Sequence, residues 1–268
     1  MRRFYLTFLM TLWILLCQGE ITQVNTMQEV FDHFKEADCK TLAIFDVDMV
    51  LVQPSDPAFQ MANMKRFNTI AKRIMQELPV EKQMIFLSLM TISSDPVLID
   101  DEIPQFLQQL IRKEIPSMAL TANLTGSFGT IKNMEQWRAH SLRCLGIDFS
   151  KTAPYSDPFI FDDLALYRGN YSTYSNGILF VNGTVVSKGE AFLSFLAKTQ
   201  ISPNKIIFID DREDNLKSLE AAIQKLGKPI EYVGLHFIGA QKYLSKMISE
   251  SEFESRWQKL ASEARVLN

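Results

Sequence analysis

Two pairs of carboxylates in this sequence stand directly after short apolar stretches. Asp46 and Asp48 follow the first stretch, and Asp210 and Asp211 follow the second. Apolar runs of this length that end in polar residues predict buried strands of a parallel sheet. The carboxyl ends of such strands lie at one edge of the sheet, where functional groups gather. A few oxygen ligands that leave room for water and a substrate suit Mg²⁺.

Thr121 and Lys188 stand at two further points where this edge would lie. Thr121 ends another apolar stretch and is followed by Ala122, although a threonine there is more often a cap or turn residue. Ser187 and Glu190 match a capping box, which predicts Lys188 as the first residue of a helix. The helix dipole disfavours a cation there by about 0.3–1 kcal/mol. A phosphate to neutralise would explain this position, and a solvated surface lysine is the alternative.

The residue types suit the hydrolysis of a phosphate monoester. An attacking carboxylate is repelled by the phosphate charge, and a divalent cation between them relieves the repulsion. Asp46 could supply the attacking oxygen and a metal ligand, with an aspartyl-phosphate as the intermediate. Asp48 could act as general acid for the leaving group and then as general base for water. Without the other groups, the same pair could equally be two loop residues.

Taken together and in this order, the four groups resemble the motifs of the haloacid-dehalogenase (HAD) superfamily over about residues 40–235. The matching residues are Asp46-Val47-Asp48 for the first motif, Thr121 for the second, Lys188 for the third and Asp210-Asp211 for the fourth. Within that superfamily, an acid at position 48 favours phosphatases over dehalogenases. More narrowly, the sequence resembles an uncharacterised group of exported bacterial HAD-like proteins.

The resemblance implies a role for each site residue. Asp46, the backbone carbonyl of Asp48, and Asp211 would hold Mg²⁺. The phosphate would be bound by Thr121, Ala122 and Lys188. Asp210 and Asp214 would lie behind the ligands, where Asp214 would hold a metal-bound water or Lys188.

The elements that position these residues form an α/β pattern. Strands alternate with helices, which predicts a doubly wound, mostly parallel, Rossmann-like sheet of the HAD type. We expect residues 20–51 and 100–240 to form the core, 52–99 a helical cap insertion and 241–268 a helical tail. Asn182-Gly183 predicts a tight β-hairpin.

The first 19 residues differ from the rest of the chain. Arg2 and Arg3 precede an uncharged apolar run over residues 4–16, and small residues precede a possible cleavage site after Gly19. This layout is typical of a secretory signal peptide and predicts export to the periplasm or the exterior. An uncleaved membrane anchor is the alternative, although the run is short for a bilayer span.

The composition of the chain limits the kinds of partner that it could bind. The net charge of −3 offers no basic surface for nucleic acid, and there is no second apolar span that would hold the chain in a membrane after cleavage. We expect a small phosphorylated metabolite as the substrate; nothing in the sequence indicates an oligomeric state. A phosphotransferase of the same fold and a non-catalytic secreted binding or effector protein are the alternative functions. Cys39 and Cys144 could form a disulfide or be two buried small apolar side chains.

Overall fold

A central α/β sheet organises the structure. The computed structural model describes residues 20–242 and 246–267, so the predicted signal peptide lies outside the described residues. Within these residues the main sheet has eight strands in the order β1-β10-β9-β2-β5-β8-β7-β6. All neighbours from β1 to β8 pair parallel, and β7 and β6 add an antiparallel edge. The predicted α/β class with a mostly parallel sheet is confirmed, and the arrangement is compatible with a Rossmann-like fold.

The strands of this sheet are β1 (Glu20–Val24), β10 (Glu231–Phe237), β9 (Lys205–Asp210), β2 (Thr41–Phe45), β5 (Ser117–Thr121), β8 (Ile178–Phe180), β7 (Thr173–Ser175) and β6 (Phe159–Ile160). β2 occupies a central position and is buried along its whole length. The sequence pattern did not predict β1, whose parallel pairing with β10 joins residues about 200 positions apart in the chain. No helix in the described part of the chain is long and apolar enough to span a membrane.

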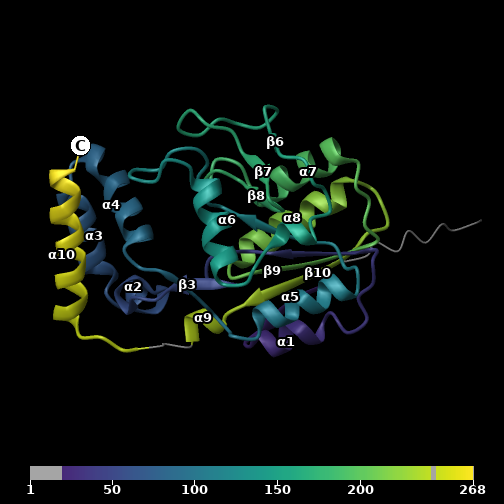
Figure 1. The fold of residues 1–268 in the computed structure, drawn as a ribbon, viewed down its shortest axis with the longest axis horizontal. Helices are drawn as coiled ribbons and strands as arrows, with labels where there is room; N and C mark the ends of the chain where they lie inside the picture. Colours follow the sequence, from purple (N-terminus) through teal and green to yellow (C-terminus); the bar gives the residue numbers. More distant parts are fainter. Residues whose placement is uncertain (1–19, 243–245, 268) are drawn as a thin grey trace, which may run out of the picture.

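Helices cover both faces of the sheet (Figure 1). Ala43 and Phe45 of β2 pack in one core cluster with residues of α1, α5 and α6, whereas Leu42 and Ile44 pack in the other with residues of α7 and α8. A strand that buries both faces needs a continuous apolar run, which explains the sequence of β2. The covering helices are α1 (Met27–Asp32), α5 (Ile103–Arg112), α6 (Met134–Cys144), α7 (Lys188–Thr199) and α8 (Glu213–Lys225).

A second group of helices, here called the helical lobe, lies beyond one end of the sheet (Figure 1). Its elements are η1 (Pro57–Phe59), α2 (Met61–Arg66), α3 (Asn68–Glu77), α4 (Val80–Ile92) and the C-terminal α10 (Glu250–Val266). The chain enters the lobe through β3 (Val52–Pro54) and leaves it through β4 (Pro96–Leu98), and these two strands pair antiparallel. The remaining short helices are η2 (Phe149–Lys151) and α9 (Gly239–Lys242).

The C-terminal helix α10 completes the core of the helical lobe. It lies beside α3 and α4 (Figure 1), and its buried face carries Phe253, Trp257 and Leu260. The Phe253 ring lies 5.0 Å from the ring of Phe67, and the indole nitrogen of Trp257 donates a hydrogen bond of 3.1 Å to the carbonyl of Ala58. The lobe is therefore built from two segments that are distant in the sequence.

The predicted hairpin at Asn182-Gly183 is wrong; the tight turn lies at Asn176-Gly177, between β7 and β8. Both pairs adopt the positive φ angles that asparagine and glycine tolerate. After Asn182-Gly183, however, the chain forms no strand before α7. The Asn182 amide instead donates to two backbone carbonyls in the loop 167–170 and so fixes that loop.

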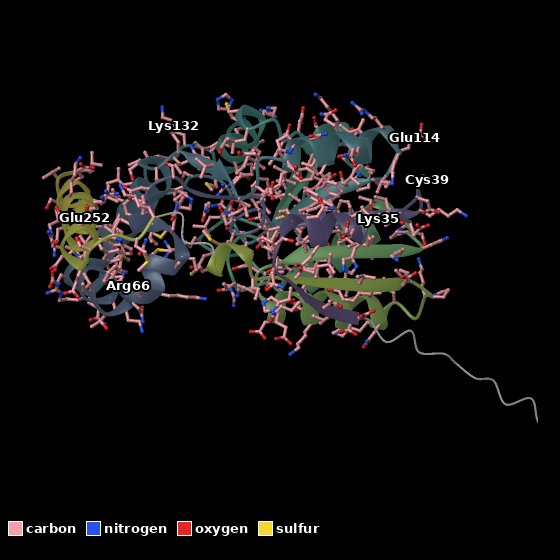
Figure 2. All side chains as sticks on the ribbon, turned by 90° about the horizontal axis from the view of Figure 1, so that it is seen from below. Lys35, Cys39, Arg66, Glu114, Lys132 and Glu252 are labelled. Atoms are coloured by element: carbon pink, nitrogen blue, oxygen red, sulfur yellow. The ribbon has the colours of Figure 1, made fainter. Side chains whose placement is uncertain are left out.

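Cys39 and Cys144 are both exposed and free. Cys39 lies at the end of the molecule opposite the helical lobe, which carries Arg66 and Glu252 in the same view (Figure 2). Both expectations for these residues are wrong, because the two cysteines are not bonded to each other and neither of them is buried.

Phe253→Ala should lower the free energy of unfolding by about 3–5 kcal/mol, because it removes a fully buried ring from the lobe core. Urea denaturation would measure this change. The control is Lys259→Ala on the exposed side of the same helix, which should change the value by less than about 0.5 kcal/mol. Equal effects of the two variants would contradict the packing of α10 on the lobe.

Candidate functional site

Three carboxylates meet where β2 and β9 end. Asp46 follows β2, Asp210 is the last residue of β9, and Asp211 comes next. Oxygens of the three side chains lie within 4.8 Å of one another, and we call this group the acidic cluster. β2 and β9 are parallel neighbours with Phe45 opposite Ile209, so the residues that follow them must come together.

Lys188 bridges two members of the acidic cluster. Its Nζ atom lies 2.8 Å from Asp46 Oδ1 and 2.6 Å from Asp210 Oδ2, and its side chain is only 2% exposed. Lys188 begins α7, and Ser187 and Glu190 form both hydrogen bonds of a capping box, which confirms its predicted helix position. The unfavourable dipole at the helix start is therefore offset by two carboxylates.

Gly189 lets α7 approach α8 closely enough to bring Lys188 to the cluster. A Cβ atom at this position would lie 2.2 Å from the backbone oxygen of Ser218 in α8. Any other residue would therefore push the start of α7 away from α8.

Asp210 is the most firmly held of the three acids. It is completely buried, and besides Lys188 its carboxylate accepts hydrogen bonds from the backbone N–H of Arg212 and the side-chain amide of Asn215, each at 2.9 Å. Asp210 thus lies in the cluster itself rather than only behind it. Asp214 is exposed in the first turn of α8, and the structure does not bring it to the cluster.

The two oxygens of Asp46 have different surroundings. Oδ1 accepts a hydrogen bond of 2.8 Å from the Val47 N–H and lies 2.8 Å from Lys188. Within the part of the chain that the structure describes, no donor is bonded to Oδ2. One oxygen is thus anchored, and the other is left to bind a cation or attack a substrate.

The acidic cluster carries more negative charge than Lys188 can neutralise. Burial raises the pKa of Asp46 to about 8 and that of Asp211 to about 6, and the charge of Asp210 adds to both effects. Burial alone would lower the pKa of Lys188, but Asp46 and Asp210 hold it above its usual value. The oxygens of the acidic cluster lie within 4.8 Å of one another, close enough for Asp46 and Asp211 to share one divalent cation. A divalent cation would therefore satisfy a charge imbalance that the fold creates.

The carboxylate of Asp48 has separate partners. Arg138 Nη2 lies 2.9 Å from Asp48 Oδ1, and the Asn123 amide donates to Oδ2 at 2.8 Å. Arg138 Nε also donates to Asn123 Oδ1 at 2.7 Å, which closes a ring of contacts that we call the Asp48 triangle. The Arg138 side chain is 5% exposed and that of Asp48 is 42% exposed. The Asp48 carboxylate lies outside the acidic cluster, and a metal bond from its backbone carbonyl stays a prediction.

Arg138 and Asn123 were not among the residues expected from the sequence. Met134, Arg138 and Leu142 recur every four residues on the buried face of α6. An arginine in such an apolar stripe must have a buried partner, because an unpaired buried charge is strongly destabilising. This four-residue spacing is the sequence feature from which the buried position of Arg138 could have been predicted.

Thr121 and Ala122 lie at the same edge of the sheet. β5, which ends at Thr121, pairs parallel with β2. The Thr121 hydroxyl accepts a hydrogen bond of 3.2 Å from the Asn123 N–H, so its own hydrogen can be donated to a ligand. Ala122 is exposed, and its carbonyl accepts a bond of 3.0 Å from the Gly183 N–H. The Ala122 N–H itself has no hydrogen bond among the described residues.

A cavity of about 320 Å³ lies between this edge and the helical lobe. Asp48, Ala122, Asn123 and Arg138 form its wall on the sheet side, and residues of α2 and α4 form the wall on the lobe side. The cavity is therefore lined by Asp48 and Ala122, two of the residues that the sequence singled out.

Residues 23–267 match the family described as "Protein of unknown function (DUF2608)". The chain belongs to this family. Its relatives include uncharacterised proteins of Rickettsia bellii, Rickettsia felis and Rickettsia typhi. The R. bellii protein is 24% identical over 243 residues, covering 87% of this chain and 82% of the relative. The R. felis protein is 25% identical over 232 residues (83% and 78%), and the R. typhi protein is 25% identical over 253 residues (88% and 85%).

No solved structure gives a significant match to the chain. The span that matches DUF2608 contains the acidic cluster, Lys188 and the Asp48 triangle, together with α10 of the helical lobe. The family match therefore extends over both the sheet and the lobe.

In a buffer free of divalent cations, the free energy of unfolding should fall as the pH rises from about 4 to 8. The folded-state pKa values of Asp211 (about 6) and Asp46 (about 8) lie above the ordinary value of 3.8, so the stabilisation is complete below pH 4 and is lost through these two values. Since one unit of pKa corresponds to about 1.4 kcal/mol, the rise of the Asp211 pKa from 3.8 to about 6 corresponds to a contribution on the order of 3 kcal/mol.

Urea denaturation at pH 4, 6 and 8 would test this dependence. Asp211→Asn should remove the fall near pH 6 and Asp46→Asn the fall near pH 8. The matched control, Asp101→Asn, changes an exposed acid and should leave the pH dependence intact. Stability that rises over this range in the wild type would contradict the charge imbalance.

Proposed function

We propose that this protein is an exported, Mg²⁺-dependent phosphatase of the HAD type that hydrolyses a small phosphate monoester. The observation that carries the proposal is Asp46, which combines an anchored oxygen with a free one inside a buried acidic cluster. Its partner Lys188 and the phosphate-binding candidates Thr121 and Ala122 belong to the same sheet edge. The four-motif resemblance assigns the same residues to this reaction.

The acidic cluster supports the choice of cofactor. Asp46, Asp211 and the backbone carbonyl of Asp48 would hold Mg²⁺, while Lys188 keeps Asp210 paired. The cation, when bound, reduces the repulsion between the carboxylate and the phosphate. A ligand set made only of oxygens favours Mg²⁺ over zinc, which prefers nitrogen and sulfur.

In the first step, Asp46 Oδ2 attacks phosphorus. The new O–P bond forms as the bond from phosphorus to the ester oxygen breaks, and an aspartyl-phosphate results. Lys188, the Thr121 hydroxyl and the Ala122 N–H would bind the phosphoryl oxygens, whose charge is spread over them as the bond breaks. Water then attacks phosphorus, inorganic phosphate leaves, and the Asp46 carboxylate is restored.

Asp48 would move the protons of both steps. For this role it would enter the cycle protonated, give its proton to the departing ester oxygen and regain one from the attacking water, which returns it to its starting state. Both of its oxygens are bonded in the Asp48 triangle, so one bond must give way to the leaving group. Because the side chain is 42% exposed at the cavity, a substrate oxygen has access to it.

The helical lobe would act as the cap expected from the resemblance. Its elements from η1 to α4 follow the first motif directly, and they form one wall of the cavity. Closure of the lobe over a small substrate would exclude bulk water while the aspartyl-phosphate forms.

Asp46→Asn should reduce Mg²⁺-dependent hydrolysis of p-nitrophenyl phosphate at least about 1000-fold, because the nucleophile is lost. The assay compares rates with Mg²⁺ and with EDTA, using protein without residues 1–19. Asp101→Asn, an exposed exchange of the same kind, is the control and should keep full activity. Activity that survives in Asp46→Asn, or that is indifferent to EDTA, would refute the mechanism.

The loss of hydrolysis rate in Asp48→Asn should depend on the leaving group of the ester. Loss of the general acid should slow hydrolysis of an alkyl phosphate by roughly 10²–10⁴-fold. The nitrophenolate leaving group needs little protonation, so the rate of p-nitrophenyl phosphate hydrolysis should fall less. Steady-state kinetics on both esters would measure the two ratios, and equal losses would argue against an acid role for Asp48.

Export should be visible at the amino terminus of the mature protein. If residues 1–19 are a signal peptide, the exported protein begins at Glu20. Terminal sequencing of protein from the periplasm or the medium of an expressing bacterium would test this. Full-length chains retained in the membrane fraction would favour the uncleaved anchor.

A further inference from the structure

The cavity beside the acidic cluster has walls suited to an apolar group. We propose that the substrates are phosphate monoesters whose alcohol part is uncharged and apolar, such as an aryl ester, and not sugar phosphates or other polyhydroxylated esters. This inference rests on the proposed phosphatase function and names the substrate class for the same site.

The size and position of the cavity match such a group. Its volume of about 320 Å³ is at the low end of ligand pockets, which range from about 300 to 1,000 Å³. Asp48 and Ala122 form part of its lining, so a phosphate bound at the sheet edge would direct its ester group into the cavity. The opposite wall includes Phe59, Met64 and Met90 of the helical lobe.

Methionine and aromatic side chains dominate the lining. Met49 and Met134 face the cavity from the sheet side, Met64 and Met90 from the lobe, and Trp137 adds an indole ring. Methionine side chains are flexible and polarisable, and they make favourable contacts with aromatic rings. A set of four around one cavity suits ring-bearing groups of differing shape.

Most polar side chains of the lining are already engaged. Ser94 accepts a hydrogen bond from a backbone N–H, and Thr91 donates to a backbone carbonyl. The members of the Asp48 triangle bond to one another, and the Arg138 charge is balanced within it. Among the described lining residues, the side-chain amide of Gln53 and the indole N–H of Trp137 have no hydrogen bond.

Because most polar side chains of the lining already have hydrogen-bond partners within the protein, the cavity favours one class of substrate over another. A sugar would bring several hydroxyl groups into the cavity, and each would give up its bonds to water with few partners in return. A second anionic group would meet no unbalanced cation there. An apolar group would lose no hydrogen bonds and would gain from burial.

Three phosphonates with the same anionic head group separate the contribution of the cavity from that of the phosphate site. The probes are 1-naphthylmethylphosphonate, methylphosphonate and 3,4-dihydroxybutylphosphonate, titrated calorimetrically into the wild-type protein without residues 1–19 in the presence of Mg²⁺. The naphthyl compound should bind at least about tenfold more tightly than methylphosphonate, since it buries an aromatic ring. The dihydroxybutyl compound should gain less than about twofold over methylphosphonate.

Two methionine variants locate the effect. Met90→Gln keeps the side-chain size but places an amide in the cavity wall, and it should lower the naphthyl preference by roughly threefold to tenfold. Met75→Gln changes another partly buried methionine of the lobe that does not line this cavity, and it should leave the preference unchanged.

The outcomes distinguish this inference from the proposed function. A preference for the dihydroxybutyl compound, no naphthyl preference, or equal effects of the two variants would overturn the substrate class. These results would leave the phosphatase proposal standing if Asp46-dependent hydrolysis persists. A naphthyl preference without hydrolysis of any ester would support the apolar site and refute the phosphatase. Absence of all binding and all hydrolysis would refute both.

Discussion

Three buried carboxylates beside one lysine, which pairs with two of them, form the constraint on which the site depends. β2 and β9 run side by side through the centre of the sheet, so Asp46, Asp210 and Asp211 must meet where these strands end. Such a cluster is unfavourable unless it is paired, protonated or bound to a cation. The start of α7 supplies one cation, and the remaining negative charge makes the edge of the sheet suited to a divalent ion.

The two acids of the first motif are separated by the fold into different environments. Asp46 faces the acidic cluster and Lys188, whereas the carboxylate of Asp48 faces the cavity and is bonded by Arg138 and Asn123. In the proposed reaction, the first carboxylate would attack phosphorus and the second would lie beside the leaving group. This division also puts the apolar cavity next to the point where a proton would be needed.

Local patterns predicted much of the site, and long-range contacts account for the rest. The apolar runs before Asp46 and Asp210 and the capping box around Lys188 are short signals, and the strands and the helix start formed where they indicated. Arg138 and Asn123 join Asp48 only through tertiary contacts. The docking of α10 on the lobe likewise depends on segments far apart in the sequence.

Magnesium binding measured by calorimetry tests the account most directly. The wild-type protein without residues 1–19 should bind one Mg²⁺ near neutral pH and release protons, because cation binding requires Asp46 and Asp211 to be ionised. Asp211→Asn should weaken binding at least about tenfold, and Asp101→Asn should not. A wild-type protein that binds no Mg²⁺, or an Asp211→Asn variant that binds it equally well, would contradict the proposal that the acidic cluster exists to hold a cation.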